Sequence, residues 1–233
     1  MTGMIIAGGV LEPAFAEKML EKAEEEEDIC LAAVDGGLEI CDRIGRSPQL
    51  LIGDFDTVRQ SVLEKYLHVA DTEVRHYNPA KDASDLELAV EALFHSGIRR
   101  ATVLGALGGR VDHSIANILL TCRAASRGMA LTILDPLNRI RSFLPGESGV
   151  QEVKIRRDEQ WGDYVGFFPA GGDTLFLSLE GFRYPLENFP LSEKLSPTRA
   201  ISNEITAETG IIRFLGGRRA CLIVTETRDR GRS

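Results

Sequence analysis

The chain has 233 residues, of which 43% are hydrophobic and 27% are charged. This length allows one large domain or two modest ones, and this composition is that of a globular protein, which excludes disordered, collagen-like and coiled-coil chains. The formal net charge of −8 argues against a general nucleic-acid binder, so we expect no nucleic-acid partner.

The sequence also bears on the compartment. No apolar run approaches the ~20 residues that a membrane span needs, so we expect no membrane partner. The N-terminal stretch has no positively charged segment before its short apolar run, which argues against a signal peptide. The four cysteines lie far apart, without the spacing of metal ligands. They are typical of reduced thiols, and we expect a cytoplasmic protein.

Residues 1 to about 140 alternate short apolar runs with helical patterns. The predicted strands are Met4–Ala7, Ile29–Val34, Leu50–Ile52, Glu73–Tyr77, Ala101–Leu104 and Ala130–Leu134. Apolar residues at helical spacing predict a helix over Ser84–Phe94, with Phe94 facing a core, and another helix over Ile115–Arg123. This alternation predicts a mostly parallel α/β sheet with helices on both faces.

From about Ile140 the pattern changes to glycines, prolines and short alternating runs. The predicted strands here are Tyr164–Phe168, Thr174–Leu179, Ile211–Phe214 and Ala220–Thr225. Short strands with turn signals predict an antiparallel sandwich or barrel. Pro145 lies between the two patterns, so we expect domains at residues 1–144 and 145–233. The charged residues Arg228–Ser233 are predicted to form a frayed tail.

Acidic residues follow two of the predicted strands. Asp54 and Asp56 come directly after Leu50–Ile52, where they would project into the crevice in which open α/β sheets bind ligands. Such a pair also makes turns and N-caps, and this structural reading stays open. Asp82 and Asp85 open a helix and can share one face of its first turn.

One part of the pattern around Asp82 and Asp85 is structural. Ser84 with Glu87 fits a capping box, so part of the signal is helix initiation.

A further carboxylate, Asp35, ends the strand Ile29–Val34. Carboxylates at the strand ends of one parallel sheet would converge and repel one another, and Mg²⁺ bound with phosphate oxygens would resolve the repulsion.

A glycine-rich segment, Gly105–His113, lies between a predicted strand and a predicted helix. Gly108 and Gly109 would let backbone amides approach an anion at a helix N-terminus, and Arg110 would grip phosphate oxygens. The segment is neither a Walker loop nor a dinucleotide-binding fingerprint. His113 is either catalytic or a residue that orients Asp112 or caps the helix, and both readings stay open.

Together these segments resemble the thiamine pyrophosphokinase (thiamine diphosphokinase) family. In the first half the resemblance rests on Asp35-Gly36-Gly37, Gly53–Thr57, Lys81–Asp85 and Gly108–His113. In the second half it rests on Gly181–Leu186 and Ile201–Glu204. The order and spacing of these segments fit the family from Met4 to about Glu226.

The resemblance implies an ATP-binding catalytic α/β domain followed by a thiamine-binding antiparallel β-sandwich. It also implies a homodimer with active sites at the subunit interface. The implied reaction is a Mg²⁺-dependent transfer of a pyrophosphoryl group from ATP to the hydroxyl of thiamine, which gives thiamine diphosphate and AMP. An attack on the β-phosphorus, roughly in line with the leaving AMP, would depend mainly on positioning and charge neutralisation.

The resemblance also assigns residues. The implied metal ligands are Asp54, Asp56, Asp82 and Asp85, and the implied catalytic residues are these four with Arg110 and Asp112. The implied ATP-binding residues are Asp35, Gly36, Gly37, Gly108, Gly109, Arg110, His113 and Asn138, with Asp135 in the same loop as Asn138. The implied thiamine-binding residues are Tyr184, which replaces the tryptophan of many members, Ser202 and Asn203.

Two other functions stay open at this stage. A catalytically silent nucleotide-binding or sensing module is disfavoured by the full set of aspartates, because carboxylates beside phosphates need a cation. A metal-dependent nucleotide pyrophosphohydrolase would not need a sandwich carrying Ser202-Asn203-Glu204. For the thiamine-binding residues the structural alternative is that Tyr184 fills the sandwich core and Ser202 ends a strand.

Overall fold

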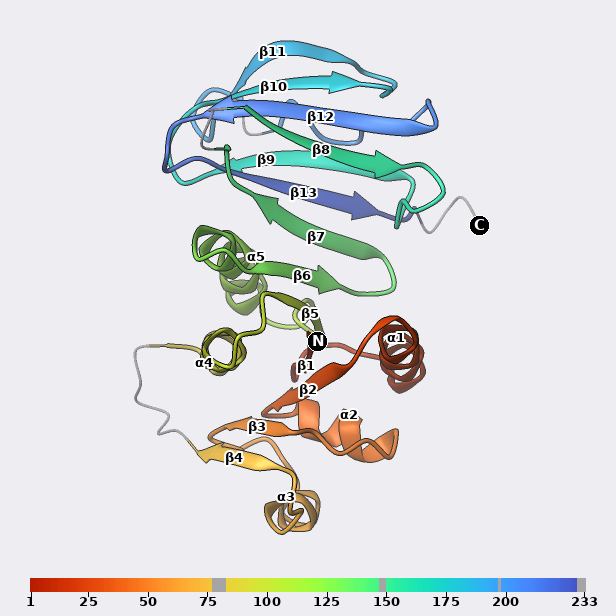
Figure 1. Ribbon diagram of the computed structural model, residues 1–233, viewed down its shortest axis with the longest axis vertical. Helices are drawn as coiled ribbons and strands as arrows, with labels where there is room; N and C mark the ends of the chain where they lie inside the picture. The colour runs from red at the N-terminus through yellow and green to blue at the C-terminus, as the bar shows by residue number, and fades with distance from the viewer. Residues whose placement is uncertain (77–82, 147–149, 197, 230–233) are drawn as a thin grey trace. The chain divides into compact units, whose positions relative to one another are not determined.

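The computed structural model describes residues 1–76, 83–146, 150–196 and 198–229 (Figure 1). The chain divides into two compact units. The first comprises Met1–Leu120 with Arg127–Pro136, and the second comprises Thr121–Ser126 with Leu137–Ser233. The first is a parallel α/β sheet and the second is built from antiparallel sheets, so the predicted fold class is confirmed.

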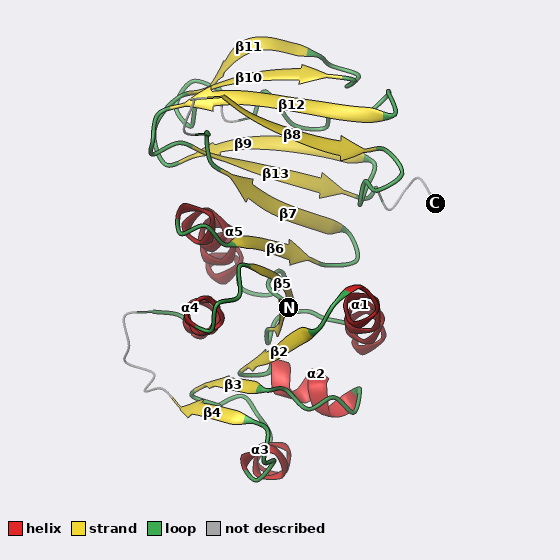
Figure 2. Cartoon of the chain, in the orientation of Figure 1, coloured by secondary structure: helices red, strands yellow, loops and turns green. Residues whose placement is uncertain are grey.

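The first unit is built on parallel strands in the order β4-β3-β2-β1-β5-β6. The strands are β1 (Thr2–Ile6), β2 (Ile29–Val34), β3 (Leu50–Gly53), β4 (Glu73–His76), β5 (Arg100–Leu104) and β6 (Ala130–Leu134). The helices are α1 (Pro13–Glu26), α2 (Gly37–Arg43), α3 (Gln60–Leu67), α4 (Asp85–His95) and α5 (Val111–Ser126). The helices α1 and α2 lie on one side of the sheet and α4 lies on the other, as Figure 2 shows. Central strands covered in this way are apolar along both faces, as β2 is.

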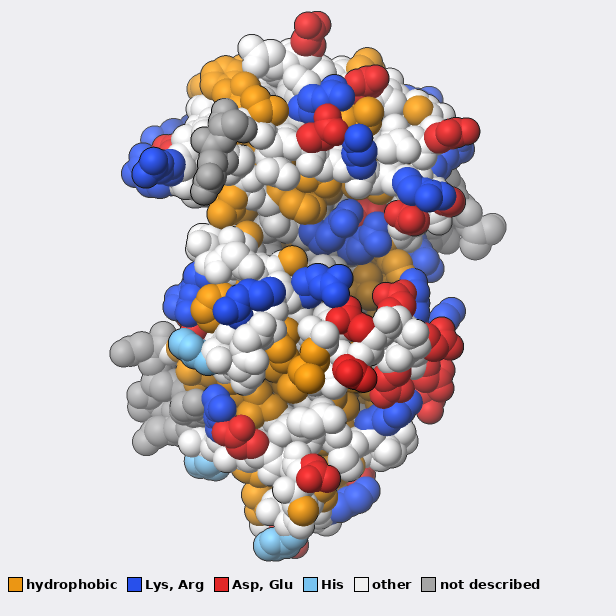
Figure 3. Space-filling model, in the orientation of Figure 1, with side chains coloured by type: hydrophobic (Ala, Val, Ile, Leu, Met, Phe, Trp, Pro, Cys, Tyr) orange, Lys and Arg blue, Asp and Glu red, His pale blue; other side chains and the backbone are white. Residues whose placement is uncertain are grey.

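Two helices of the first unit, α1 and α4, show the expected residues at their first turns, and α1 buries one apolar face. Pro13 occupies the first turn of α1, and this helix buries Ala16, Met19 and Leu20 against the sheet. Its glutamates point outward and form the acidic area seen over α1 in Figure 3. In α4 the predicted cap is present, since the Ser84 hydroxyl accepts a hydrogen bond from the backbone N–H of Glu87 at 3.2 Å.

One predicted core residue of α4 lies at the surface of the core instead. Phe94 is only half-buried, and its ring is covered by the guanidinium groups of Arg99 and Arg127 at 4.1 and 4.3 Å. The arginines take the place of an apolar neighbour because a guanidinium stacks well on an aromatic face.

The second unit is a β-sandwich. One sheet has the order β7-β13-β9 and the other has the order β11-β10-β12-β8, all antiparallel. The strands are β7 (Asn138–Phe143), β8 (Val150–Arg156), β9 (Tyr164–Ala170), β10 (Leu175–Glu180), β11 (Leu186–Leu191), β12 (Thr209–Gly216) and β13 (Cys221–Thr227). Inward-facing side chains of both sheets, such as Phe167, Leu177, Phe214 and Val224, share one core.

Two features of this unit differ from the sequence predictions. Residues 138–143 were expected in the first domain, but β7 pairs with β13 and therefore belongs to the second unit. The tail prediction was wrong for Arg228 and Asp229. The backbone N–H of Arg228 donates to Leu137 O at 2.8 Å, and that of Asp229 donates to the carboxylate of Asp163 at 2.8 Å. Residues 230–233 lie outside the described residues.

Candidate functional site

Asp35 organises the turn that follows the neighbouring strand. It comes directly after β2 with φ 44°, and its Oδ1 accepts hydrogen bonds from the backbone N–H groups of Asp54 at 3.2 Å and Phe55 at 3.4 Å. Gly53 makes this approach possible, because a Cβ atom there would lie 1.7 Å from the same oxygen. The sequence alone did not indicate this positioning role for Asp35.

The electrostatics of Asp35 show which carboxylates lie near it. Burial, together with the negative charges of Asp85 and Asp54, raises the pKa of Asp35 to about 7. Hydrogen bonding from the Phe55 amide opposes the shift. The first unit therefore brings Asp35, Asp54 and Asp85 together at the carboxyl edge of the sheet, and we call these three residues the aspartate cluster.

The other predicted acidic residues are placed differently. Asp56 is exposed, and its backbone N–H donates to the carboxylate of Asp54 at 3.2 Å. The Asp54 side chain thus also stabilises its own turn, which was the structural reading of this pair. Asp82 lies outside the described residues.

The glycines near this edge allow close backbone packing. A Cβ atom on Gly37 would lie 2.0 Å from Ile6 O, and one on Gly9 would lie 2.3 Å from Gly105 O. Gly36 lies beside Gly8 in the same crowded region. Gly108 and Gly109 are exposed, and Gly109 has φ 69° with open space where a side chain would project. The ends of β1, β2 and β5 are therefore close-packed, whereas the loop before α5 is open at Gly109.

Arg110 and Asp112 pair with each other at the start of α5. The Nε and Nη2 atoms of Arg110 donate to the two carboxylate oxygens of Asp112 at 3.1 and 2.5 Å. This hydrogen bonding lowers the pKa of Asp112. Both side chains are mostly exposed, at 72% and 63%, so the pair is weak and free to exchange for a ligand. His113 is exposed beside them.

Within the second unit, Asn203 holds the loop that carries Tyr184. Asn203 is 3% exposed, and its Oδ1 accepts from the backbone N–H groups of Tyr184 and Glu204, both at 3.0 Å. Its Nδ2 donates to Tyr184 O at 2.8 Å. Tyr184 is 58% exposed, so the alternative that it fills the sandwich core is wrong. Ser202 is also exposed and has φ 55°.

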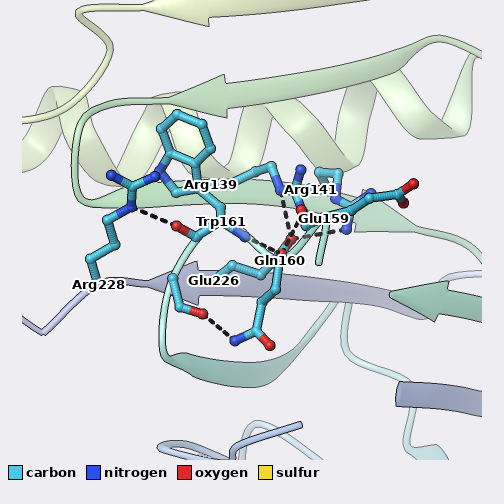
Figure 4. A network of polar contacts seen from close by, with 8 residues as sticks. Arg139, Arg141, Glu159, Gln160, Trp161, Glu226 and Arg228 are labelled. Carbon is cyan, nitrogen blue, oxygen red and sulfur yellow. Dashed lines mark hydrogen bonds and ion pairs between the residues drawn. The ribbon is translucent and has the colours of Figure 1, made fainter. Parts of the chain in front are cut away.

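Asn138 opens β7, where its Oδ1 accepts from the Thr227 hydroxyl at 3.1 Å. The next residues of β7 belong to an ionic network that the sequence did not predict (Figure 4). Glu226 is fully buried and accepts hydrogen bonds from Arg139 at 2.8 Å and Arg141 at 2.9 Å, and from the backbone N–H of Trp161 at 3.1 Å. The available signal was an Arg-x-Arg alternation in β7 opposite an acidic residue in β13.

A cavity of about 230 Å³ lies elsewhere in the first unit. It lies at the amino ends of β1, β5 and β6, and the residues that line it include Thr2, Arg100 and Ala130. The aspartate cluster lies at the carboxyl ends of the strands, so this cavity is not its ligand site. Among the described helices, none is long and apolar enough to cross a membrane.

A parallel α/β unit with carboxylates at the carboxyl edge of its sheet, followed by a β-sandwich with an exposed aromatic loop, defines a two-domain α/β enzyme. Comparison with known families gives the particular family. The sequence model of the "Thiamin pyrophosphokinase, catalytic domain" matches residues 21–133, and that of the "Thiamin pyrophosphokinase, vitamin B1 binding domain" matches residues 150–216. The chain belongs to the thiamine pyrophosphokinase family, as its motifs predicted.

Individual relatives agree over nearly the whole chain. The thiamine pyrophosphokinase of Bacillus subtilis is 29% identical over 213 residues, which cover 91% of this chain and 94% of the relative. The solved structure from Bacillus subtilis has a TM-score of 0.81 at 29% identity and covers 98% of this chain and 100% of that one. The structure of the Geobacillus thermodenitrificans thiamin pyrophosphokinase has a TM-score of 0.78 at 27% identity, covering 99% of each chain.

Proposed function

We propose that this protein transfers a pyrophosphoryl group from ATP to the hydroxyl of thiamine, giving thiamine diphosphate and AMP. The observation that carries the proposal is the convergence of Asp35, Asp54 and Asp85 at the edge where open α/β sheets bind ligands. Membership of the thiamine pyrophosphokinase family supports thiamine as the acceptor. The same membership argues against a silent nucleotide-binding module.

The chemistry of the donor set fits Mg²⁺. Within the described part of the chain no group of His, Cys, Asp and Glu is arranged closely enough to hold a metal by itself. Burial and the nearby charges of Asp85 and Asp54 raise the pKa of Asp35, and a cation would relieve the repulsion among these carboxylates. Asp54, Asp56, Asp82 and Asp85 would hold the ion together with phosphate oxygens. When bound, Mg²⁺ supplies neutralisation of the charge that develops on the transferring group.

The loop before α5 would bind the phosphates of ATP. Gly108 and Gly109 are exposed, and their backbone amides would lie beside a helix N-terminus, which favours an anion. Arg110 would exchange its exposed partner Asp112 for phosphate oxygens, and His113 would line the same loop. We assign the remaining ATP contacts to Gly36, Gly37 and Asn138, with Asp35 at the same edge. One carboxylate of the site would accept the proton of the thiamine hydroxyl.

The second unit would bind thiamine. An exposed tyrosine ring on a loop fixed by a buried amide is a stacking surface suited to the cationic thiazolium. Tyr184, Ser202 and Asn203 would form this site. We therefore assign ATP binding mainly to the first unit and thiamine binding to the second unit. We further propose a homodimer with sites between subunits, which works in the cytoplasm, where free cysteines remain reduced.

The deciding experiment is a ³¹P NMR time course with ATP, Mg²⁺ and thiamine. We expect thiamine diphosphate and AMP in equal amounts. ADP with thiamine monophosphate would overturn the proposed reaction, and ATP breakdown that does not depend on thiamine would indicate a pyrophosphohydrolase.

The shared site is tested by mixing two inactive variants under conditions that exchange subunits. One variant carries Asp54→Asn and the other carries Ser202→Ala with Asn203→Ala. If each site uses both subunits, heterodimers regain part of the activity. Verified heterodimers without activity would place the whole site in one chain.

A further inference from the structure

Two cysteines of the second unit lie on the same face of one sheet. In the pairing of β7 with β13, Ser142 is opposite Ile223, and Cys221 lies two residues before Ile223. Residues two apart in a strand share a face, so Ser142 and Cys221 point to the same side. The Ser142 hydroxyl lies 2.5 Å from the Thr121 hydroxyl and 3.4 Å from Cys122 Sγ. The end of α5 therefore brings Cys122 onto the face that carries Cys221.

The two thiols differ in a way that suits a redox reaction. Cys122 is half-buried, and the hydrogen bond from the Cys221 thiol lowers the pKa of Cys122 to about 7. The same contact, with burial, raises the pKa of Cys221, which is only 3% exposed. A reachable sulfur with thiolate character next to a protected thiol is the arrangement of an attacking and a resolving cysteine. Cys30 and Cys41 differ, because burial raises the pKa of both.

We propose that Cys122 and Cys221 form a modification site at which hydrogen peroxide converts the two thiols into a disulfide joining α5 to β13. The Cys122 thiolate attacks a peroxide oxygen, the O–O bond breaks, and a sulfenic acid and hydroxide form. The Cys221 sulfur then attacks the sulfenic sulfur, so that the S–S bond forms, the S–O bond breaks and water leaves. In total the two thiols lose two electrons, and hydrogen peroxide becomes two waters.

The proposed site is independent of the proposed function, because neither cysteine belongs to the aspartate cluster or to the thiamine-binding loop. Disulfides in reducing compartments are usually transient and redox-sensing, and a thiol reductant would restore the pair. The bond would fasten the last turn of α5 to the first residue of β13.

The test is a peptide map of the wild-type protein. Reduced protein is treated with hydrogen peroxide, quenched with catalase, alkylated in denaturant and digested with trypsin without reduction. We expect the peptide of residues 111–123 joined to that of residues 220–228, with both thiols recovered after dithiothreitol. Cys30 and Cys41 should remain alkylated. Cys122 accumulating as sulfinic acid, or no cross-link at a dose that oxidises Cys30, would overturn the proposal.

Cysteine variants test which thiol attacks the peroxide and which completes the disulfide. Cys122→Ser should abolish the cross-link and leave Cys221 available for alkylation. Cys221→Ala should abolish the cross-link, and because it removes the hydrogen bond that lowers the pKa of Cys122, Cys122 should also oxidise more slowly than in the wild-type protein. The matched control, Cys30→Ser, should form the cross-link at the wild-type rate. A cross-linking rate that falls as far in Cys30→Ser as in Cys122→Ser would contradict the assignment, and the wild-type map decides the question even if a variant folds poorly.

Discussion

The side chain of Asp35 fixes the backbone of Asp54, because its Oδ1 accepts the Asp54 N–H at 3.2 Å. Asp35 itself has φ 44°, a left-handed conformation that Asp and Asn tolerate better than most residues. A carboxylate in the proposed ATP site therefore has a structural function that is separate from its charge. Substitutions at this position separate the two functions.

We predict that Asp35→Asn preserves the turn and Asp35→Ala does not. Asparagine keeps an oxygen acceptor and tolerates the backbone conformation, whereas alanine leaves amides of the turn without that acceptor and is strained at positive φ. Both variants lose the charge, so their difference isolates the positioning role. We expect the free energy of unfolding of Asp35→Ala, measured in urea, to be lower than that of Asp35→Asn by about 2 kcal/mol or more. Equal stabilities of the two variants would contradict the positioning role.

The pKa of Asp35 predicts how the stability of the metal-free protein depends on pH. In the folded chain this pKa is about 7, above its ordinary 3.8. The Asp35 carboxyl thus binds its proton more tightly in the folded state than in the unfolded state. Protonation of Asp35 therefore stabilises the fold at low pH, and this stabilisation is lost as the pH rises from about 4 to 7. Relative to Asp35→Asn, wild type should lose at most about 1.4 kcal/mol of unfolding free energy per pH unit across this range.

Urea titrations in EDTA between pH 4 and 8 measure this dependence. Asp112→Asn is the control with the opposite sign, because the pKa of Asp112 is lowered and its small contribution is lost as the pH falls. A difference between wild type and Asp35→Asn that stays constant with pH would show that Asp35 ionises normally.

We predict that Asp54→Asn and Asp56→Asn each lower kcat roughly a hundredfold or more while the protein stays folded. The expected loss comes from removing a charge that would hold Mg²⁺ against the transferring phosphates in the proposed site. Steady-state rates and thermal melts of the same variants separate this from a structural role. Near-normal rates with a lower Tm would instead assign these aspartates to the turn, and Asp158→Asn is the control on an exposed carboxylate.

The buried Glu226 predicts a large effect on stability. It is fully buried and forms ion pairs with both Arg139 and Arg141, which are mostly buried themselves. Removing one member of a buried ion pair leaves an uncompensated charge, so Glu226→Gln should lower the free energy of unfolding by about 3 kcal/mol or more. Asp158→Asn, which breaks the exposed pair with Arg156, should change it by less than about 0.5 kcal/mol. Denaturant titrations compare the two, and equal effects would refute a structural role for the network.

The regular part of the fold was readable from local patterns. The bounds of β2 and β6 agree with the apolar runs Ile29–Val34 and Ala130–Leu134, because strands buried on both faces leave a continuous apolar signal. The strands β7, β8 and β11 were missed for different reasons. β7 carries arginines that turn toward a buried glutamate, and β8 and β11 are polar or proline-containing edge strands.

The site was predictable only in part. Aspartates after strand ends indicated an acidic edge, since parallel strands end together, and the structure places Asp35, Asp54 and Asp85 near one another. The sequence did not indicate that Asp35 would hold a neighbouring turn, because that depends on the pairing of β2 with β3 and on the absence of a side chain at Gly53. It also did not indicate that Asn203 would be buried as a clamp on Tyr184.

The exposed ring of Tyr184 predicts a specific effect on thiamine binding. If the ring stacks on the thiazolium, Tyr184→Phe keeps the aromatic face and should keep the KM for thiamine within about twofold. Tyr184→Ala should raise this KM by about 2- to 30-fold, which corresponds to the roughly 0.5–2 kcal/mol of a cation–π contact. The KM for ATP should not change in either variant, because Tyr184 would not contact the nucleotide.

The stability of the Tyr184 variants provides the check on this reasoning. The loop is held through the backbone of Tyr184 by Asn203, and the tyrosine ring is 58% exposed, so truncating the ring should leave the urea midpoint nearly unchanged. Asn203→Ala removes the clamp and should lower stability by about 1–3 kcal/mol as well as weaken thiamine binding. A Tyr184→Ala protein with wild-type KM for thiamine, or one whose midpoint falls as far as that of Asn203→Ala, would mean that the ring serves the fold and not the substrate.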